Sequence, residues 1–486
     1  MEYKLSHILS AVKVISSKGA VDPVVSEIIF DSREAGINSV FVAIKGTQTD
    51  GHQYIKGVFE AGCKAVVCEV MPEVIPDDCI SLQVENSSEA LGQMASIFYD
   101  NPSEKLKLVG VTGTNGKTTI ATLLYEMSRL LGNKTGLFST VANFIDGKEI
   151  KATHTTPDAV TLNRMMKQMV DEGCSYCFME VSSHAIHQKR ISGLTFAGGI
   201  FTNITHDHLD YHKTFKAYIT AKKVFFDGLN KKAFALVNAD DKNGAVMVQN
   251  TKASVYTYSV RDMADFKGRI IESMFEGMQL IIDGQEVWTT FVGFFNAQNL
   301  MAVYGAARTL GFEKGDVLVA LSKLQSVDGR FETIRSDDGK TAVVDYAHTP
   351  DALKNVIDTI NQIRSFDQQL ITVVGAGGDR DMSKRPVMAA EAVKGSSKVI
   401  LTSDNPRSEE PEQIIEDMME GVTFKERIKV ISITNRKEAI KTACMVARAG
   451  DIILIAGKGH ETYQEVKGKR THFDDREIVK EIFAQK

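Results

Sequence analysis

Short apolar runs and segments with helical spacing follow one another along most of the chain. The run at residues 107–111 has the length and polar flanks of a buried strand, and residues 120–127 then place apolar side chains at helical spacing. Strands and helices continue to alternate to about residue 327, with a further helix predicted at 214–230. This order is typical of an α/β domain with a mostly parallel sheet.

Residues 253–295 interrupt this alternation. Their pattern predicts antiparallel β structure, with a hairpin turn at Asp283-Gly284 after an apolar strand. Before residue 105, the pattern predicts strands at 28–30 and 40–44 and helices near 53–62 and 88–99. After residue 328, four apolar runs predict a doubly wound, Rossmann-like domain, at 342–345, 370–374, 399–401 and 452–455.

The chain has 486 residues, enough for about three domains with separate cores. We expect them at residues 1–105, 106–327 and 328–486, with Asn101-Pro102-Ser103 at the first boundary. A net charge of −5 argues against non-specific binding to nucleic acid. Neither a signal peptide nor an apolar run of about 20 residues is evident, so we expect a cytoplasmic protein with no membrane span.

The six cysteines include one Cys-x-x-Cys pair, Cys174 and Cys177. This spacing occurs in redox and zinc sites, but no second pair is present to complete a zinc site. Because Cys177 lies in an apolar run, we interpret these residues as buried thiols.

The stretch Thr112-Gly113-Thr114-Asn115-Gly116-Lys117-Thr118-Thr119 connects a predicted strand to a predicted helix. Glycines let the backbone curl so that its N–H groups face an anion at the helix N-terminus. The Lys117 ammonium can reach the outer phosphates of a nucleotide, and the Thr118 hydroxyl can coordinate Mg²⁺. Val111 replaces the first glycine of the general motif, which leaves the shorter form Gly-x-x-Gly-Lys-Thr. We predict a phosphate-binding loop.

Acidic and imidazole groups follow two later strands of the same segment. Glu180 ends an apolar strand, where a carboxylate can reach a metal beside a phosphate loop; a surface-facing glutamate is the alternative. Residues 206–212 hold three histidines and two aspartates. Such a cluster suggests a zinc hydrolase as an alternative function, although Tyr211 breaks the usual spacing before His212. A polar loop with hydrogen-bonded histidines is the simpler alternative.

These motifs resemble those of the Mur ligases of bacterial cell-wall synthesis. The resemblance covers nearly the whole chain and rests on residues 113–118, 180–184, 207–212, 329–332 and 345–350. It implies a UDP-MurNAc-binding N-terminal domain, a central ATP-binding domain like those of phosphate-loop NTPases, and a C-terminal amino-acid-binding domain. Within the family, residues 377–381, 404–407 and 457–461 resemble members that add meso-diaminopimelate.

The resemblance implies roles for residues of the first two domains. Lys117, Glu180, His208 and Lys222 correspond to the catalytic set, and Lys222 to a lysine that CO₂ converts to a carbamate (N6-carboxylysine). Of these, Glu180, His208 and the Lys222 carbamate, with Thr118, would hold two Mg²⁺. The implied ATP contacts are Gly113, Thr114, Asn115, Gly116, Lys117, Thr118, Thr119, Asn296, Asn299, Arg330 and Asp345. Those for the UDP-sugar are Ser32, Thr155, Thr156, Ser182, Gln188 and Arg190. From the residues alone, Lys222 reads as an exposed helix lysine and Ser32 as a cap in a polar turn.

The implied diaminopimelate contacts are Arg380, Asp404, Asn405, Pro406, Arg407, Gly457 and Glu461. Arg407 is the informative one, because diaminopimelate carries a side-chain carboxylate that lysine lacks, and a buried arginine can bind it through two hydrogen bonds. The alternative is a solvated turn arginine. Family members that use lysine generally lack this arginine.

The implied reaction is the ATP-dependent joining of meso-diaminopimelate to UDP-MurNAc-L-Ala-D-Glu through an acyl phosphate, in peptidoglycan precursor synthesis. We expect a monomer. The remaining alternatives are a lysine-adding ligase, a folylpolyglutamate synthase, a phosphate-loop ATPase that is not a ligase, and the metallohydrolase built on residues 206–212.

Overall fold

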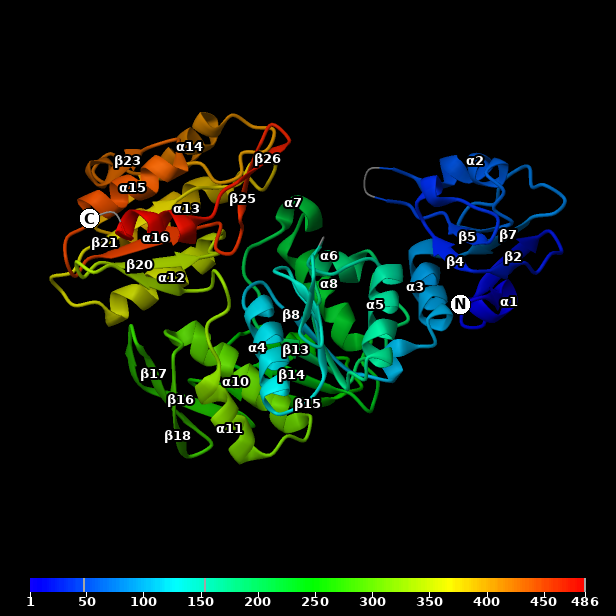
Figure 1. Cartoon of the computed structure of the whole chain (residues 1–486), viewed down its shortest axis with the longest axis horizontal. Helices are drawn as coiled ribbons and strands as arrows, with labels where there is room; N and C mark the ends of the chain where they lie inside the picture. The colour runs from blue at the N-terminus through cyan, green and yellow to red at the C-terminus, as the bar shows by residue number, and fades with distance from the viewer. Residues whose placement is uncertain (47–48, 153, 485–486) are drawn as a thin grey trace.

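The computed structural model describes residues 1–46, 49–152 and 154–484. They form three lobes in a row (Figure 1), with the N-terminal lobe at one end and the C-terminal lobe at the other. Each lobe is built on its own large sheet. The predicted class is confirmed: three α/β domains, of which the central one has a mostly parallel sheet and the C-terminal one is Rossmann-like.

The N-terminal sheet has the order β2-β7-β6-β5-β4, and only β2 runs antiparallel to its neighbour. Its strands are β2 Val14–Lys18, β4 Glu27–Ile29, β5 Ser39–Val42, β6 Ala65–Cys68 and β7 Ile80–Val84. A small pair, β1 Tyr3–Lys4 and β3 Val24–Val25, lies beside it. The helices are α1 Leu5–Ile8, α2 Ile55–Glu60 and α3 Ser87–Phe98. The side-chain oxygen of Asn86 starts α3 by accepting a hydrogen bond from the Glu89 N–H.

The central sheet has eleven strands in the order β11-β10-β9-β12-β8-β13-β14-β15-β16-β17-β18. The strands are β8 Lys107–Thr112, β9 Thr135–Phe138, β10 Asn143–Ile145, β11 Lys148–Ile150, β12 Tyr176–Glu180, β13 Gly198–Phe201, β14 Phe234–Asn238, β15 Ser254–Ser259, β16 Phe266–Met274, β17 Gly277–Ile282 and β18 Gln285–Thr289. The helices are α4 Lys117–Leu130, α5 Ala159–Asp171, α6 Ser183–His187, α7 Leu209–His212, α8 Phe215–Asp227, α9 Gly244–Met247, α10 Phe294–Thr309 and α11 Lys314–Lys323. The buried strand β8 lies near the middle, so its carboxyl end opens at the centre of the lobe.

The prediction of antiparallel structure across residues 253–295 is wrong in its first part. β15 pairs parallel with β14, and the start of β16 pairs parallel with the end of β15. Only β16, β17 and β18 are antiparallel to one another, with the predicted turn at Asp283-Gly284 between the last two. The connection through α9 is long enough for the return that a parallel pair requires. A strand's own residues do not encode the direction of its partner.

The C-terminal sheet has the order β19-β20-β24-β21-β22-β23, with β19 as its antiparallel edge. Its strands are β19 Glu332–Arg335, β20 Thr341–Asp345, β21 Leu370–Val374, β22 Lys398–Leu401, β23 Val430–Ser432 and β24 Ile452–Ala456. The helices are α12 Pro350–Ile363, α13 Lys384–Gly395, α14 Pro411–Met419, α15 Arg436–Val446 and α16 Asp475–Ala484. A hairpin, β25 Tyr463–Val466 and β26 Lys469–His472, follows β24. The four predicted strands of this lobe are confirmed as β20, β21, β22 and β24.

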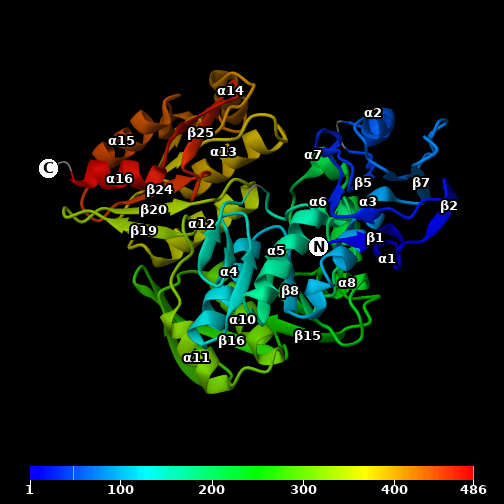
Figure 2. The ribbon, with the colours of Figure 1, turned by 45° about the vertical axis from the view of Figure 1, so that its right-hand side comes forward.

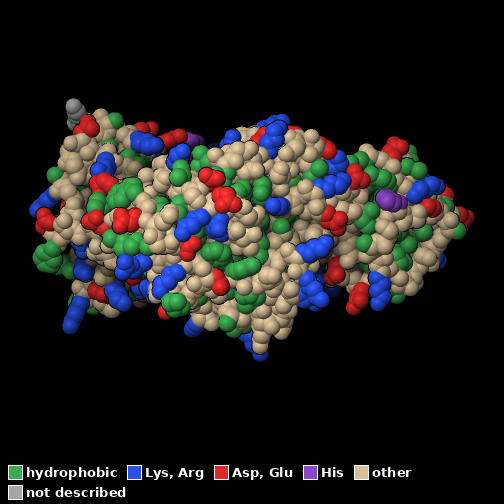
Figure 3. Space-filling view, turned by 90° about the horizontal axis from the view of Figure 1, so that it is seen from below, with side chains coloured by type: hydrophobic (Ala, Val, Ile, Leu, Met, Phe, Trp, Pro, Cys, Tyr) green, Lys and Arg blue, Asp and Glu red, His purple; other side chains and the backbone are tan. Residues whose placement is uncertain are grey.

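Helix α3 of the N-terminal lobe packs against α5 of the central lobe, and the turned view in Figure 2 shows this junction from the side. Acidic and basic side chains are intermixed over the face seen in Figure 3. Among the described residues, no helix combines the length and apolarity that a membrane span needs. All six cysteines are buried free thiols, which confirms the prediction for Cys174 and Cys177, and burial raises the pKa of the Cys177 thiol.

Candidate active site

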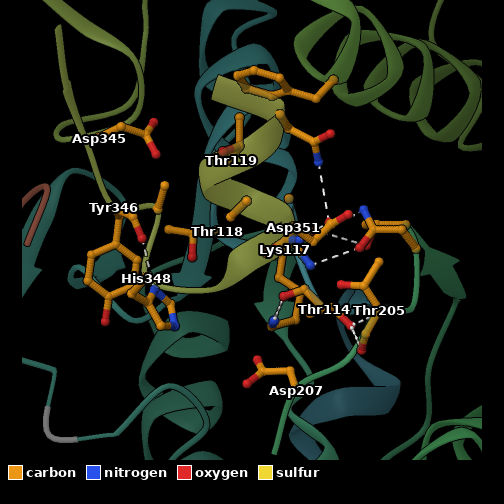
Figure 4. A pocket seen from close by; sticks show the side chains of 18 of the residues that line it. Thr114, Lys117, Thr118, Thr119, Thr205, Asp207, Asp345, Tyr346, His348 and Asp351 are labelled. Carbon is orange, nitrogen blue, oxygen red and sulfur yellow. Dashed lines mark hydrogen bonds between the residues drawn. The ribbon is translucent and has the colours of Figure 1, made fainter. Parts of the chain in front are cut away.

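A cleft of about 940 Å³ lies between the central and C-terminal lobes. The central lobe lines it with the loop after β8 and the ends of β12 and β13, and the C-terminal lobe with the loops after β20, β21, β22 and β24. Figure 4 shows Asp345, Tyr346 and His348 on one side of this pocket and Thr114, Lys117 and Thr205 on the other. Carboxyl ends of parallel strands from two sheets therefore face one cavity, as in other α/β sites.

The predicted phosphate loop joins β8 to α4 at the floor of the cleft. Gly113 and Gly116 adopt φ values of 156° and 86°. A Cβ on Gly116 would also lie 2.6 Å from Asn299 Oδ1, so this position requires glycine. Within the described chain no side chain caps α4, which leaves its first N–H groups directed at the cleft. Lys117 Nζ donates to the carbonyl oxygens of Gly113 at 3.0 Å and Thr114 at 2.7 Å.

Lys222 is a buried residue of α8, only 1% exposed. Its Nζ donates to the Gly113 carbonyl oxygen at 2.7 Å, so this one oxygen accepts from both Lys222 and Lys117. Burial, and then the nearby Lys117 charge, lowers the pKa of Lys222 well below its ordinary value. The exposed helix lysine that the residue pattern alone suggests is therefore wrong, because α8 turns this side chain toward the loop.

Glu180 and Thr118 supply oxygen atoms beside the loop, and both side chains are nearly fully buried. Glu180 Oε1 accepts from the Thr140 N–H at 2.7 Å. Thr118 Oγ1 accepts from Arg330 Nη2 at 3.2 Å, across the boundary between lobes. A carboxylate and a hydroxyl are the hard ligands that Mg²⁺ prefers, so this donor set suits that ion.

His208 lies in the same cleft in the left-handed backbone conformation, with φ 54°. Burial lowers the pKa of His208 to about 3, because its effect outweighs the attraction of the Asp207 carboxylate. The ring is therefore neutral at pH 7, and its unprotonated nitrogen has a lone pair that can bind a cation. Among residues 1–46, 49–152 and 154–484, no three His, Cys, Asp or Glu side chains gather as a metal site. Residues 206–212 hence do not form the metal cluster that a hydrolase of this type would need.

The predicted ATP residues of the later segments lie around the same loop. Asn296 and Asn299 are buried on α10, and Asn299 Nδ2 donates to Asn296 Oδ1 at 3.3 Å. Asp345 Oδ2 accepts from the Phe331 N–H at 2.7 Å, and burial raises the pKa of Asp345 to about 6. Arg330 lies over the Tyr346 ring at 4.5 Å. Residues of both lobes thus line one cleft.

Four of the six predicted UDP-sugar residues form one hydrogen-bonded group, whereas Thr155 is hydrogen-bonded to Thr140. Arg190 donates to Thr156 O at 2.8 Å and to Gln188 Oε1 at 2.7 and 3.0 Å. Ser182 N donates to Thr156 Oγ1 at 3.2 Å, and Thr155 Oγ1 accepts from Thr140 at 3.1 Å.

Ser32 is the sixth residue of this set, and it does not join the group. It begins the short 3₁₀ segment η1 Ser32–Glu34 in the N-terminal lobe, outside the cleft. The capping serine suggested by the pattern is also wrong, because Asp31 is the cap and its side chain accepts from the Arg33 N–H.

The predicted amino-acid residues meet at the C-terminal side of the cleft. Asn405 Nδ2 donates to Glu461 Oε2 at 2.7 Å, and Arg407 Nη1 donates to Gly378 O at 2.7 Å. Asp404 is 8% exposed, and its Oδ2 accepts no hydrogen bond within the described chain. A Cβ on Gly457 would lie 2.6 Å from that oxygen. Arg380 also lines the cleft, as an exposed side chain, whereas Pro406 is buried and is not among the lining residues.

Two contacts between lobes were not predicted from the sequence. Lys384, the first residue of α13, forms an ion pair with Asp207. Asn115 Nδ2 in the phosphate loop donates to Asp351 Oδ2 of α12 at 3.0 Å. Burial alone would raise the pKa of Asp207, but His208 and Lys384 outweigh it and lower that pKa. Asp207 belongs to the histidine- and aspartate-rich stretch at residues 206–212, whereas no sequence motif singles out Lys384.

Comparison with known proteins agrees with this architecture. Sequence models match at residues 24–99 (Mur ligase family, catalytic domain), 111–307 (Mur ligase middle domain) and 329–459 (Mur ligase, glutamate ligase domain). The chain belongs to the Mur ligase family, as its motifs predicted.

Individual relatives cover the chain from end to end. A protein of Phocaeicola vulgatus named UDP-N-acetylmuramoyl-L-alanyl-D-glutamate–2,6-diaminopimelate ligase is 58% identical over 99% of both chains. One of the same name from Clostridioides difficile is 40% identical over 99% of this chain and all of its own. A solved structure under that name has 32% identity and a TM-score of 0.70, with 99% of each chain covered.

Proposed function

We propose that this chain is an ATP-dependent ligase that joins meso-2,6-diaminopimelate to UDP-MurNAc-L-Ala-D-Glu in peptidoglycan precursor synthesis. One observation carries the proposal: a single cleft places a phosphate loop opposite a pocket with Asp404, Asn405, Arg407 and Glu461. The relatives at 55–58% identity over 99% of this chain all carry the name of a ligase for these substrates.

The phosphate loop is proposed to hold the nucleotide. Lys117 leaves the carbonyl oxygens of Gly113 and Thr114 to bind the outer phosphates, together with the uncapped N–H groups of α4. Asp345 accepts from the ribose, and Asn296 and Asn299 lie near the base. Arg330 moves from Thr118 toward the phosphates, so the two lobes bind the nucleotide together.

Thr118, Glu180 and His208 are proposed to hold Mg²⁺, which would offset the negative charge of the reacting phosphate groups. Burial lowers the pKa of the Lys222 amine, which favours the nucleophilic form that adds CO₂ and loses a proton. The resulting carbamate is an anion, which suits a site rich in cations better than an ammonium would.

The D-glutamyl carboxylate then attacks the γ-phosphorus, so that an acyl phosphate forms and ADP leaves. The amine of the diamino acid attacks the acyl carbon, and phosphate leaves. Thr155, Thr156, Ser182, Gln188 and Arg190 position the UDP-sugar, with Ser32 reaching it from the N-terminal domain. The cleft between lobes would keep water from the acyl phosphate.

The domain limits 1–105, 106–327 and 328–486 and a monomeric state in the cytoplasm belong to the same proposal. The separate sheets of the three lobes support those limits.

Phosphate release from ATP tests the function, measured with UDP-MurNAc-L-Ala-D-Glu and either meso-diaminopimelate or L-lysine. Release that requires diaminopimelate, with the matching product mass, is expected. Release only with lysine would support the lysine-adding alternative, and release without either amino acid would support an ATPase.

A further inference from the structure

Arg436, the first residue of α15, is fully buried and has no part in the reaction proposed above. Its guanidinium binds Asp475 of α16 through two hydrogen bonds, from Nε at 2.8 Å and from Nη2 at 2.7 Å. Both side chains are 0% exposed. A buried arginine costs desolvation energy, so its remaining contacts deserve a functional explanation.

Those contacts reach the ends of two neighbouring segments of the amino-acid pocket. Nη2 donates to Ala456 O at 3.0 Å, the residue before Gly457, and Nη1 donates to Ser403 O at 3.5 Å, the residue before Asp404. Nη1 also lies 4.0 Å from Asp404 Oδ2. The Arg436 guanidinium therefore binds the backbone just before Asp404 and just before Gly457, and it lies close to the Asp404 carboxylate.

The pairing of the buried charged groups points the same way. Lys458, 0% exposed, donates to Glu461 Oε2 at 3.1 Å and to Asn405 Oδ1 at 3.2 Å. Asp475 pairs with Arg436 and Glu461 pairs with Lys458, whereas Asp404 Oδ2 accepts no hydrogen bond within the described chain. Burial, and then the charge of Asp404, raises the pKa of Glu461, so these groups already compete for positive charge. A ligand ammonium would supply the donor that Asp404 Oδ2 lacks.

We propose that Arg436 is a positioning residue for the incoming diamino acid, which holds the Asp404 segment in place with Oδ2 free to accept from the ligand's ammonium. This inference rests on the proposed function. A purely architectural role would instead tie α15 to α16 without affecting one substrate more than another.

The test is steady-state kinetics of Arg436→Lys, which keeps the charge but loses the planar fork. We expect the KM for meso-diaminopimelate to rise about tenfold, as loss of about 1.4 kcal/mol of binding implies. The KM values for ATP and for the UDP-sugar should stay within about twofold. Lys437→Ala is the matched control, since it removes an exposed ion pair to Glu481 that joins the same two helices. Its KM values should all remain those of the wild type.

A double-mutant cycle with Asp404→Asn separates the two roles. If Arg436 acts through Asp404, adding Arg436→Lys to Asp404→Asn should raise that KM by less than twofold further. Equal changes in all three KM values, or a lower kcat with every KM unchanged, would overturn the inference. Should Arg436→Lys fail to fold, Asp475→Asn decides by the same measurement, with a smaller rise expected. Wild-type enzyme inactive with diaminopimelate would refute the proposed function instead.

Discussion

Replacement of Arg407 by methionine gives a direct test of how the cleft selects its amino acid. Two hydrogen bonds hold the backbone of Arg407 against the hairpin of β25 and β26. The Arg407 N–H donates to Glu465 O at 3.0 Å, and the Lys467 N–H donates to Arg407 O at 2.5 Å. Its Nη1 donates to Gly378 O, and among the described residues its Nε and Nη2 donate no hydrogen bond. Two donors of a held guanidinium are thus available to a side-chain carboxylate.

The expected loss follows from that contact. A hydrogen bond to a charged group contributes about 1.5–3 kcal/mol, so Arg407→Met should lower kcat/KM for meso-diaminopimelate about 10- to 150-fold. The value for L-lysine, which lacks the carboxylate, should change by no more than about twofold. Arg407 has φ 53°, a conformation equally strained for methionine, so the comparison isolates the side-chain head group.

Phosphate release with each amino acid, at saturating ATP and UDP-sugar, supplies both values. Unchanged ADP affinity and melting temperature serve as controls. An equal fall with diaminopimelate and lysine would refute the reasoning, because it would show that Arg407 supports the pocket without contacting the carboxylate that distinguishes the two substrates.

Three further predictions concern the nucleotide side of the cleft. Gly116→Ala, with φ 86° and its Cβ 2.6 Å from Asn299 Oδ1, should cost about 1–2 kcal/mol of stability and weaken ATP binding, as measured by thermal unfolding and calorimetry. Wild-type activity should fall in CO₂-depleted buffer and return with bicarbonate, whereas Lys222→Ala should be inactive at every bicarbonate concentration; a bicarbonate-independent wild type would contradict the carbamate. The raised pKa of Asp345, about 6 against 3.8 unfolded, means that its ionisation lowers stability as pH rises from about 4 to 6. Asp345→Asn should therefore gain in melting temperature relative to wild type between pH 4 and pH 8, and a constant difference would count against that assignment.

The features that the sequence predicted best are those that depend on a few consecutive residues. The phosphate loop depends on residues 112–119 alone, and the C-terminal strands were visible as apolar runs whose polar ends share one edge of a sheet. It did not predict the direction of β15, which depends on the path of the connection before it.

The contacts between lobes could not be predicted from the sequence either. Lys384 and Asp207 are 177 positions apart, and Asn115 and Asp351 are 236 apart, so each pair depends on how two separately folded sheets are placed. The burial of Lys222 has the same origin, because helical spacing shows which face of α8 is apolar but not that a loop of another segment covers this lysine.

The carbonyl oxygen of Gly113 accepts from both Lys117 and Lys222. A carbonyl oxygen has two lone pairs, and here both face a lysine amine. Conversion of Lys222 to an anion would withdraw one donor, draw the other lysine toward the new charge and change the loop before any nucleotide arrives. With the proposed carbamate on Lys222, the affinity of the loop for nucleotide should therefore vary with the concentration of dissolved CO₂.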